Sequence, residues 1–228
     1  MFDGTFRKPV DRAVKPIGAF LRKTKLTPDH LTILGLLVGV GAAVAIGFGR
    51  LWLGLALVIL AGLPDLLDGA LAKATGTSSQ RGAFFDSTVD RVTDSLLLGG
   101  IGWHFALTED PRLVLLPFAV ASMSSIISYQ RAKAESLGID AKGGLMERAE
   151  RIIAICIGLA FNVLLIPILW LMLVLTTITA VQRFAKVWKA ADVAPVTAAK
   201  IEMRRSRRQS RRVARTERRR TQVPRRKQ

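Results

Sequence analysis

Residues 65–90 read DLLDGALAKATGTSSQRGAFFDSTVD and join two long apolar segments of the chain. Four carboxylates in this stretch fall at helical spacing, Asp65 and Asp68 on the first segment and Asp86 and Asp90 on the second. Acidic side chains within a membrane span are costly and require a compensating partner. A hard divalent cation is the natural partner for clustered carboxylates. The stretch therefore predicts two adjoining transmembrane helices that share a metal site.

The composition outside this stretch is also typical of an integral membrane protein. Half of the 228 residues are hydrophobic, the mean hydropathy is +0.32, and the apolar residues gather in long runs. Most of these runs reach the roughly 20 residues that cross a bilayer. We expect an all-α, polytopic membrane protein with six transmembrane helices, at residues 31–48, 51–72, 82–106, 113–134, 147–165 and 167–188.

Basic extensions flank the predicted transmembrane domain of residues 26–190. Residues 1–25 place apolar side chains at helical spacing with Lys and Arg between them, which predicts an amphipathic helix in the membrane interface. The alternative is an ordinary amphipathic helix packed on the domain. Residues 200–228 hold fourteen Lys or Arg against two Glu, and so supply +12 of the net charge of +17.

The predicted tail, residues 191–228, is low in apolar content and is expected to be disordered. Its cations would bind anionic lipid head groups if it lies beside the inner leaflet. A nucleic-acid partner is the weaker alternative and is not expected, because no aromatic residues interleave with the cations as a stacking platform. We interpret the tail as a surface tether.

The distribution of cations predicts the orientation. The connections on one side of the predicted bundle contain Arg50 and Arg112 as their only cations, whereas both terminal segments and the connections at 73–81 and 131–151 are basic. Cytoplasmic loops of membrane proteins carry an excess of Lys and Arg. We therefore expect a multi-pass protein of the cell membrane with both termini in the cytoplasm.

The first span has a recognisable start. Thr27 is a candidate N-cap, Pro28 suits the first helical position, and Asp29 would interact favourably with the helix dipole. Gly35 and Gly39 further along would allow close contact with another helix, and they are the one local hint of a dimer.

The carboxylates have a simple geometry if the second and third spans are antiparallel neighbours. Each pair lies on one helix face, because its members are three or four residues apart. Asp68 and Asp86 would share one depth, and Asp65 and Asp90 another, roughly 10–12 Å below the helix ends at a rise of 1.5 Å per residue. All four would then converge on one pocket that opens to the cytoplasm.

Two divalent cations would neutralise four carboxylates, and two-metal sites suit displacement at phosphorus. Gly69 and Gly82 lie beside the acids and would let a phosphate or nucleotide approach the backbone. Two alternatives remain open from the acids alone. One is a proton-coupled or cation-coupled transporter, and the other is a set of structural acids paired with Arg81 and Arg91.

This stretch resembles the CDP-alcohol phosphatidyltransferase family. The family motif is Asp-x-x-Asp-Gly-x-x-Ala-Arg, then eight or nine residues, then Gly-x-x-x-Asp-x-x-x-Asp. Residues 65–90 match it except at Lys73, where Arg is usual. Lys keeps the charge but loses the forked contact with phosphate. The family's Pro-x-x-x-Thr segment is similar to Pro28 and Thr32, for which a plain helix start is the alternative.

The resemblance implies two Mg²⁺ or Mn²⁺ ions held by Asp65, Asp68 and Asp86, with Asp90 completing the site and acting as general base. It implies that CDP-diacylglycerol is bound by Pro28, Thr32, Gly69, Ala72, Lys73 and Gly82. Asp94 continues the helical stripe of Gly82, Asp86 and Asp90 but lies outside the motif. We expect Asp94 to be a buried, hydrogen-bonded acid, with Ser95 or Thr93 nearby.

The stretches 128–151 and 182–183 look like the actinobacterial branch of the family, the phosphatidylinositol phosphate synthases. That branch implies a homodimer that transfers a phosphatidyl group to inositol 1-phosphate and releases CMP. Glycerol 3-phosphate, the acceptor of phosphatidylglycerophosphate synthases, is the alternative.

Both acceptors are dianions that need cations near the metal site. The candidates at the predicted cytoplasmic ends are Arg131, Lys133, Arg148, Arg151 and Arg183. The resemblance favours Arg151, Arg183 and either Arg131 or Lys133 as the phosphate ligands. Arg148 has the alternative of pairing with Glu147 or Glu150, and any one of the five has the alternative of merely setting the topology.

Overall fold

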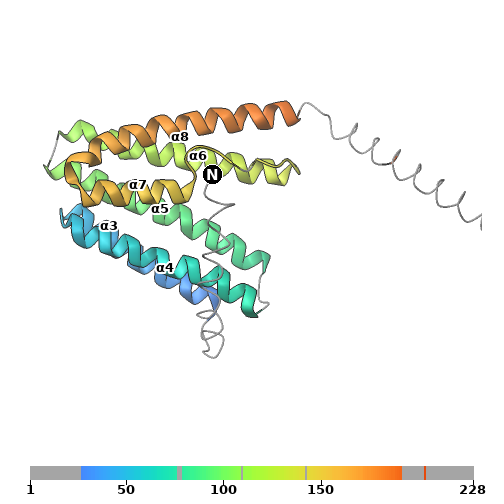
Figure 1. Ribbon diagram of the computed structural model, residues 1–228, viewed down its shortest axis with the longest axis horizontal. Coiled ribbons are helices and arrows are strands. Elements are labelled where there is room, and N and C mark those ends of the chain that lie inside the picture. The colour runs from blue at the N-terminus through green and yellow to red at the C-terminus, as the bar shows by residue number, and fades with distance from the viewer. Residues whose placement is uncertain (1–26, 76–78, 109, 142, 192–202, 204–228) are drawn as a thin grey trace, which may run out of the picture. The chain divides into compact units, whose positions relative to one another are not determined.

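The computed structural model describes residues 27–75, 79–108, 110–141, 143–191 and 203, and from 64 to 75 it describes the helical backbone alone. Its elements, labelled as in Figure 1, are α3 (Pro28–Gly47), α4 (Leu51–Thr75), α5 (Gln80–Thr108), the short 3-10 helix η1 (Pro111–Val114), α6 (Leu115–Ser136), α7 (Arg148–Ala160) and α8 (Asn162–Ala191). Every element in these ranges is helical, which confirms the predicted all-α class.

The chain separates into two compact units, Met1–Phe184 and Ala185–Gln228. The first contains α3 to α7 and most of α8, and the second begins with the last residues of α8. The interfacial helix predicted at residues 1–25 lies outside the described residues, as does nearly all of the tail predicted at 191–228.

Helix α3 begins where the sequence predicts. The Thr27 hydroxyl accepts a hydrogen bond from the His30 backbone N–H, and the His30 ring accepts one from the Thr27 N–H, both at 3.4 Å. This reciprocal cap satisfies two backbone donors that have no partner within the helix. Pro28 occupies the first turn, as does Asp29, whose negative charge suits the positive end of the helix dipole.

Helix α3 packs against both α4 and α5 (Figure 1). Its contact with α5 is unusually close, because a Cβ atom added to Gly100 would lie 2.5 Å from the carbonyl oxygen of Ala43. A Cβ atom on Gly39 would likewise lie 3.0 Å from the methyl group of Thr93. Gly39 therefore contacts a helix of its own chain, and a dimer contact through Gly35 and Gly39 stays a prediction.

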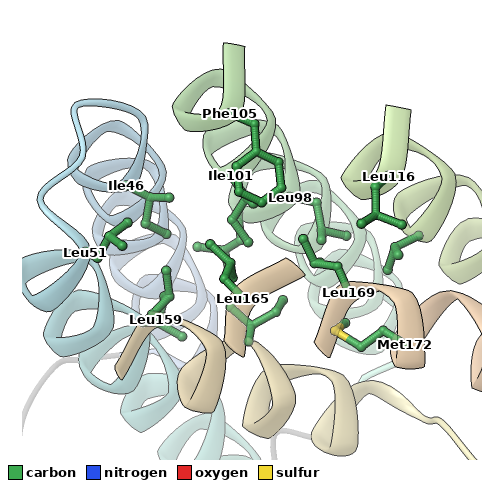
Figure 2. Packing of buried hydrophobic residues seen from close by; sticks show 14 of the residues in the cluster. Ile46, Leu51, Leu98, Ile101, Phe105, Leu116, Leu159, Leu165, Leu169 and Met172 are labelled. Carbon is green, nitrogen blue, oxygen red and sulfur yellow. The ribbon is translucent and has the colours of Figure 1, made fainter. Parts of the chain in front are cut away.

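One apolar core joins all six long helices (Figure 2). Its buried members include Ile46 of α3, Leu51 of α4, Leu98, Ile101 and Phe105 of α5, Leu116 of α6, Leu159 of α7, and Leu165, Leu169 and Met172 of α8. On α5 these core residues occupy the second half of the helix, whereas the aspartates occupy the first half. The acidic residues and the core residues of α5 are thus separated along the length of the helix.

Three helical stretches in the described ranges are long and apolar enough to span a bilayer: Pro28–Gly47, Pro111–Ser136 and Asn162–Ala191. Leu51–Leu63 is a shorter apolar helix. Helix α5 has 29 residues but carries charged side chains through its first half. Six elements therefore match the predicted spans in order, while length and composition alone support three of them.

The predicted boundary between the last two spans is wrong. Helix α7 has 13 residues, which at 1.5 Å per residue is about 20 Å, too short to cross a bilayer unaided. The chain leaves the helical conformation at Phe161 and enters α8 at Asn162. Pro167, where the prediction began the last span, lies inside α8 and can give no backbone N–H to the helix.

Candidate active site

Helix α5 has a stripe of four residues at every fourth position: the predicted site residues Gly82, Asp86 and Asp90, followed by Asp94. This spacing places them on one face, as predicted. The exposure of the aspartates falls along the stripe. Asp86 and Asp90 are half-buried, whereas Asp94 is 8% exposed. The acids therefore extend from the end of the bundle towards its interior.

The start of α5 lies beside the start of α3. The Ser79 hydroxyl accepts a 3.0 Å hydrogen bond from the Gly82 N–H and caps the helix. A Cβ atom on Gly82 would lie 3.8 Å from an Asp29 carboxylate oxygen. The Thr32 hydroxyl donates to the Pro28 carbonyl oxygen at 3.2 Å. Three of the residues predicted to bind the nucleotide thus lie on two adjoining helix ends.

Asp90 lies between two guanidinium groups. Its carboxylate is 3.0 Å from Arg148 at the start of α7 and 3.4 Å from Arg91 on α5. The Asp90 side chain is 16% exposed and that of Arg148 is 29% exposed, so both remain within reach of a ligand. Among the contacts described, Arg148 pairs with Asp90, the predicted catalytic acid.

Asp94 forms a buried ion pair with α7. An Arg151 nitrogen lies 2.6 Å from one carboxylate oxygen, and the Arg148 Nε lies 3.6 Å from the other. Arg151 is 4% exposed. The prediction that Asp94 is buried and hydrogen-bonded is confirmed, and its described partners are arginines of α7.

Arg183 of α8 is a second buried cation, and it ties three segments together. Its guanidinium donates to the carbonyl oxygens of Ile127 on α6 and Gly143 in the α6–α7 connection, both at 2.9 Å. It also lies 3.3 Å from a Glu147 carboxylate oxygen. A buried arginine is tolerable when such hydrogen bonds replace its lost hydration. Arg183 therefore holds the end of the connection that leads into α7.

The remaining predicted cations lie on α6. Arg131 pairs with Glu135 at 3.1 Å on the same helix, and Lys133 is exposed in the last turn. Arg131 and Arg151 both lie within electrostatic range of Arg183. Four of the five predicted phosphate ligands are thus linked, since Arg148 and Arg151 also share Asp94, and Lys133 has no described contact with them.

Sequence reasoning did not identify Thr179, and it named Glu147 only as an alternative partner of Arg148. The Thr179 hydroxyl accepts hydrogen bonds from the backbone N–H groups of Leu145 and Met146, each at 3.2 Å. Thr179 precedes Arg183 by four residues on the same face of α8, which is the one available sequence signal. Glu147 precedes Arg148, where it serves as a further acid beside the cations.

The first half of the predicted acid cluster lies on α4. The side chains of Asp65, Asp68, Gly69, Ala72 and Lys73 are outside the described residues. Their helix ends at Thr75, and α5 starts at Gln80, so these two ends are at most about 18 Å apart. Among the side chains that are described, no group of three His, Cys, Asp or Glu is placed to hold a metal ion.

Sequence comparisons find known relatives over most of the chain. The family model described as CDP-alcohol phosphatidyltransferase matches residues 25–188. The phosphatidylinositol phosphate synthase of Mycobacterium tuberculosis is 37% identical over 187 residues, which cover 78% of this chain and 86% of that protein. The synthase of Corynebacterium glutamicum is 34% identical over 193 residues, 81% of this chain and 88% of that protein.

Solved structures of the M. tuberculosis synthase are also similar to this chain. The crystal structure of the M. tuberculosis synthase with CDP-DAG bound has a TM-score of 0.73 at 35% identity, and covers 78% of this chain and 94% of that chain. The structure of the same enzyme in complex with manganese and citrate has a TM-score of 0.72 at 35% identity. The match covers 77% of this chain and 88% of that chain.

Proposed function

The chain belongs to the CDP-alcohol phosphatidyltransferase family, and from this premise we propose that it transfers a phosphatidyl group from CDP-diacylglycerol to inositol 1-phosphate. The products would be phosphatidylinositol phosphate and CMP. Family membership confirms the predicted enzyme class and removes the transporter that the acids alone left open. Together with the apolar helices, it makes the chain an integral membrane protein.

The contact between Arg148 and Asp90 is the observation that supports this function most directly. Arg148, one of the five cations predicted to bind the acceptor phosphate, lies 3.0 Å from the carboxylate expected to take the acceptor proton. A phosphate bound by Arg148 would therefore bring an adjacent hydroxyl close to Asp90. Such positioning is the main requirement when a bound nucleophile attacks a second bound substrate.

The charge of the surroundings suits a dianionic acceptor. Arg131 and Arg151 each lie within electrostatic range of Arg183, and Arg151 also shares Asp94 with Arg148. Guanidinium groups bind phosphate oxygens through paired, charge-assisted hydrogen bonds. We assign acceptor binding to Arg148, with support from Arg131, Arg151 and Arg183, and we place Lys133 at the rim.

Divalent metal ions fit the acid stripe. Asp86 and Asp90 offer carboxylate oxygens one turn apart on one face of α5, and such oxygens are the ligands that Mg²⁺ and Mn²⁺ prefer. In our proposal Asp65 and Asp68 of α4 complete a site for two ions. Bound there, the ions would acidify the attacking hydroxyl and stabilise the negative charge on the leaving phosphate.

The chain's own residues account for the remaining steps. Asp90 takes the proton from the acceptor hydroxyl as its oxygen forms a bond to the phosphorus that carries diacylglycerol. The bond from that phosphorus to the CMP oxygen breaks, and CMP leaves with the electron pair. The donor is held by Pro28, Thr32 and Gly82 at the adjoining ends of α3 and α5, and by Gly69, Ala72 and Lys73 of α4.

We also propose how the protein lies in the membrane. Residues 26–190 form a six-helix catalytic domain in the cell membrane, with both termini in the cytoplasm. Residues 1–25 lie in the interface as an amphipathic helix, and residues 191–228 tether the protein to anionic lipid. The functional form is a homodimer, as the family resemblance implies.

An acceptor panel tests the function. Purified protein in detergent with CDP-diacylglycerol and Mg²⁺ should release CMP with inositol 1-phosphate, and not with inositol or glycerol 3-phosphate. Arg148→Gln should raise the KM for inositol 1-phosphate about tenfold or more, because it loses a charge-assisted contact. Arg112→Gln, which removes an exposed cation from η1, is the control and should leave that KM unchanged. CMP release with glycerol 3-phosphate instead would overturn the proposed acceptor.

A further inference from the structure

The connection between α6 and α7 ends at a hydrogen-bonded contact with α8. Leu145 and Met146 both donate their backbone N–H groups to the Thr179 hydroxyl oxygen at 3.2 Å, and the hydroxyl donates its proton to the Leu175 carbonyl oxygen at 2.8 Å. Thr179 is completely buried. A hydroxyl offers one donor and two acceptor positions, so this contact uses its full capacity.

The contact lies next to the proposed acceptor site. Glu147 and Arg148 follow Met146 directly, and Arg148 is the first residue of α7. Glu147 is the N-cap residue of α7, but its side chain makes no capping hydrogen bond. The start of α7 is therefore held through the connection, by Thr179 at Leu145 and Met146 and by Arg183 at Gly143 and Glu147.

We propose that the Thr179 hydroxyl is a positioning residue for the acceptor-phosphate site. By fixing the backbone of Leu145 and Met146, it sets where the Arg148 guanidinium meets Asp90. This inference rests on the proposed function, because it assigns acceptor binding to Arg148. Thr179 itself touches neither Asp90 nor Arg148 in the described contacts, so it acts through the connection.

Removal of the hydroxyl leaves two backbone donors without their acceptor. A buried N–H that lacks a partner is costly, so the connection is expected to move until these groups find another acceptor or water. A shift of about 1 Å in a substrate-positioning group is enough to weaken catalysis or binding substantially. The effect should fall on the acceptor, because the donor side is built by α3, α4 and the start of α5.

Helix α8 supplies a matched control in Thr176. This residue is also completely buried, and its hydroxyl donates to the carbonyl oxygens of Met172 and Leu173 within the same helix. Thr176→Val removes a buried hydroxyl from the same helix without disturbing the α6–α7 connection. Any general cost of placing Val in this part of α8 should appear equally in both variants.

The experiment measures separate KM values for acceptor and donor in full-length protein. Thr179→Val should raise the KM for inositol 1-phosphate about tenfold, with the KM for CDP-diacylglycerol and kcat changed less than about twofold. Thr179→Ser, which restores the hydroxyl, and Thr176→Val should both behave like the wild type. An unchanged acceptor KM in Thr179→Val would overturn the inference, as would an equal rise in Thr176→Val or Thr179→Ser.

A replacement variant and a replacement substrate cover the two ways in which the experiment could fail for other reasons. If Thr179→Val does not fold, Thr179→Cys replaces it, since a thiol is a weak acceptor of similar size. If the wild type uses glycerol 3-phosphate, the proposed acceptor fails, and the same comparison is made with that compound because it carries the same phosphate monoester. Failure of the acceptor identity and failure of the positioning role are then separate outcomes.

Discussion

Asp90 and Asp94 stand one helical turn apart on α5, yet their surroundings differ. The Asp94 carboxylate is 2.6 Å from a buried arginine, whereas Asp90 meets the more exposed Arg148 and Arg91. Asp94 is held in a buried pair, whereas the partners of Asp90 remain accessible to a ligand. We propose a structural role for Asp94 and a reactive role for Asp90.

Asp90→Asn tests the reactive role. The amide keeps the shape of the side chain but cannot accept a proton, so CMP release should fall by about 10²–10⁴-fold, the usual contribution of a general base. Binding of CDP-diacylglycerol should be largely retained, as judged by titration of the purified variant. CMP release at the wild-type rate would eliminate Asp90 as the base.

Asp94→Ala tests the structural role. Removal of one partner leaves Arg151 charged and buried, which typically costs about 3–5 kcal/mol. Thermal unfolding in detergent should therefore show a large drop in Tm. Glu135→Gln is the control, because its pair with Arg131 is exposed, with side chains 51% and 38% accessible, and such pairs contribute less than about 1 kcal/mol. Equal drops in the two variants would contradict this assignment.

At the scale of elements, the contact between α3 and α5 decides how the two helix starts meet. Backbone touches backbone at Ala43 and Gly100, which leaves no room for a side chain. Small residues at helix contacts are the usual means of close approach in membranes, where association depends on packing and polar contacts. This seam aligns the first turn of α3 with the first turn of α5, where the donor is proposed to bind.

Gly100→Ala should destabilise the protein by about 1–3 kcal/mol, because the added methyl group must push the two backbones apart. Gly99→Ala is a matched control on the neighbouring residue. A Cβ atom there meets nothing within 4 Å, and alanine is the better helix former. Tm in detergent should fall for the first variant and stay or rise for the second. The reverse order would mean that α3 and α5 do not pack in this way.

Local signals predicted some elements well and failed at others. The start of α3 was predictable because its cap is formed by residues three apart in sequence. The break at Phe161 was not, because the apolar run continues through it and Pro167 suggests a later start. The spacing of Asp90 and Asp94 correctly predicted that they share one face of a helix. Their pairing with α7 depends on packing between residues 57 positions apart.

At the scale of the molecule, polar and apolar contacts of the first unit separate along the helix axes. The shared apolar core takes the second half of α5, while the aspartates of its first half meet the start of α7. Such a division suits an enzyme whose substrates include one soluble in water and one dissolved in lipid. The polar end would receive the acceptor, and the helices would keep the donor's acyl chains in the bilayer.

Deletion of residues 200–228 tests whether the proposed tether is separate from the active site. CMP release by the truncated protein in detergent should match that of the full chain, because no catalytic residue is proposed in this segment. Binding to vesicles that contain anionic lipid should weaken, since each Lys or Arg near such a surface contributes about 1 kcal/mol. A loss of CMP release would contradict the assignment of the tail.

The central claim is that the acids of α4 and α5 bind divalent cations which the phosphatidyl transfer requires. The most direct measurement is CMP release from CDP-diacylglycerol and inositol 1-phosphate before and after chelation of divalent metal. Chelation should abolish CMP release, and added Mg²⁺ or Mn²⁺ should restore it. Release that continues unchanged in excess chelator would show that the transfer needs no divalent cation at these acids.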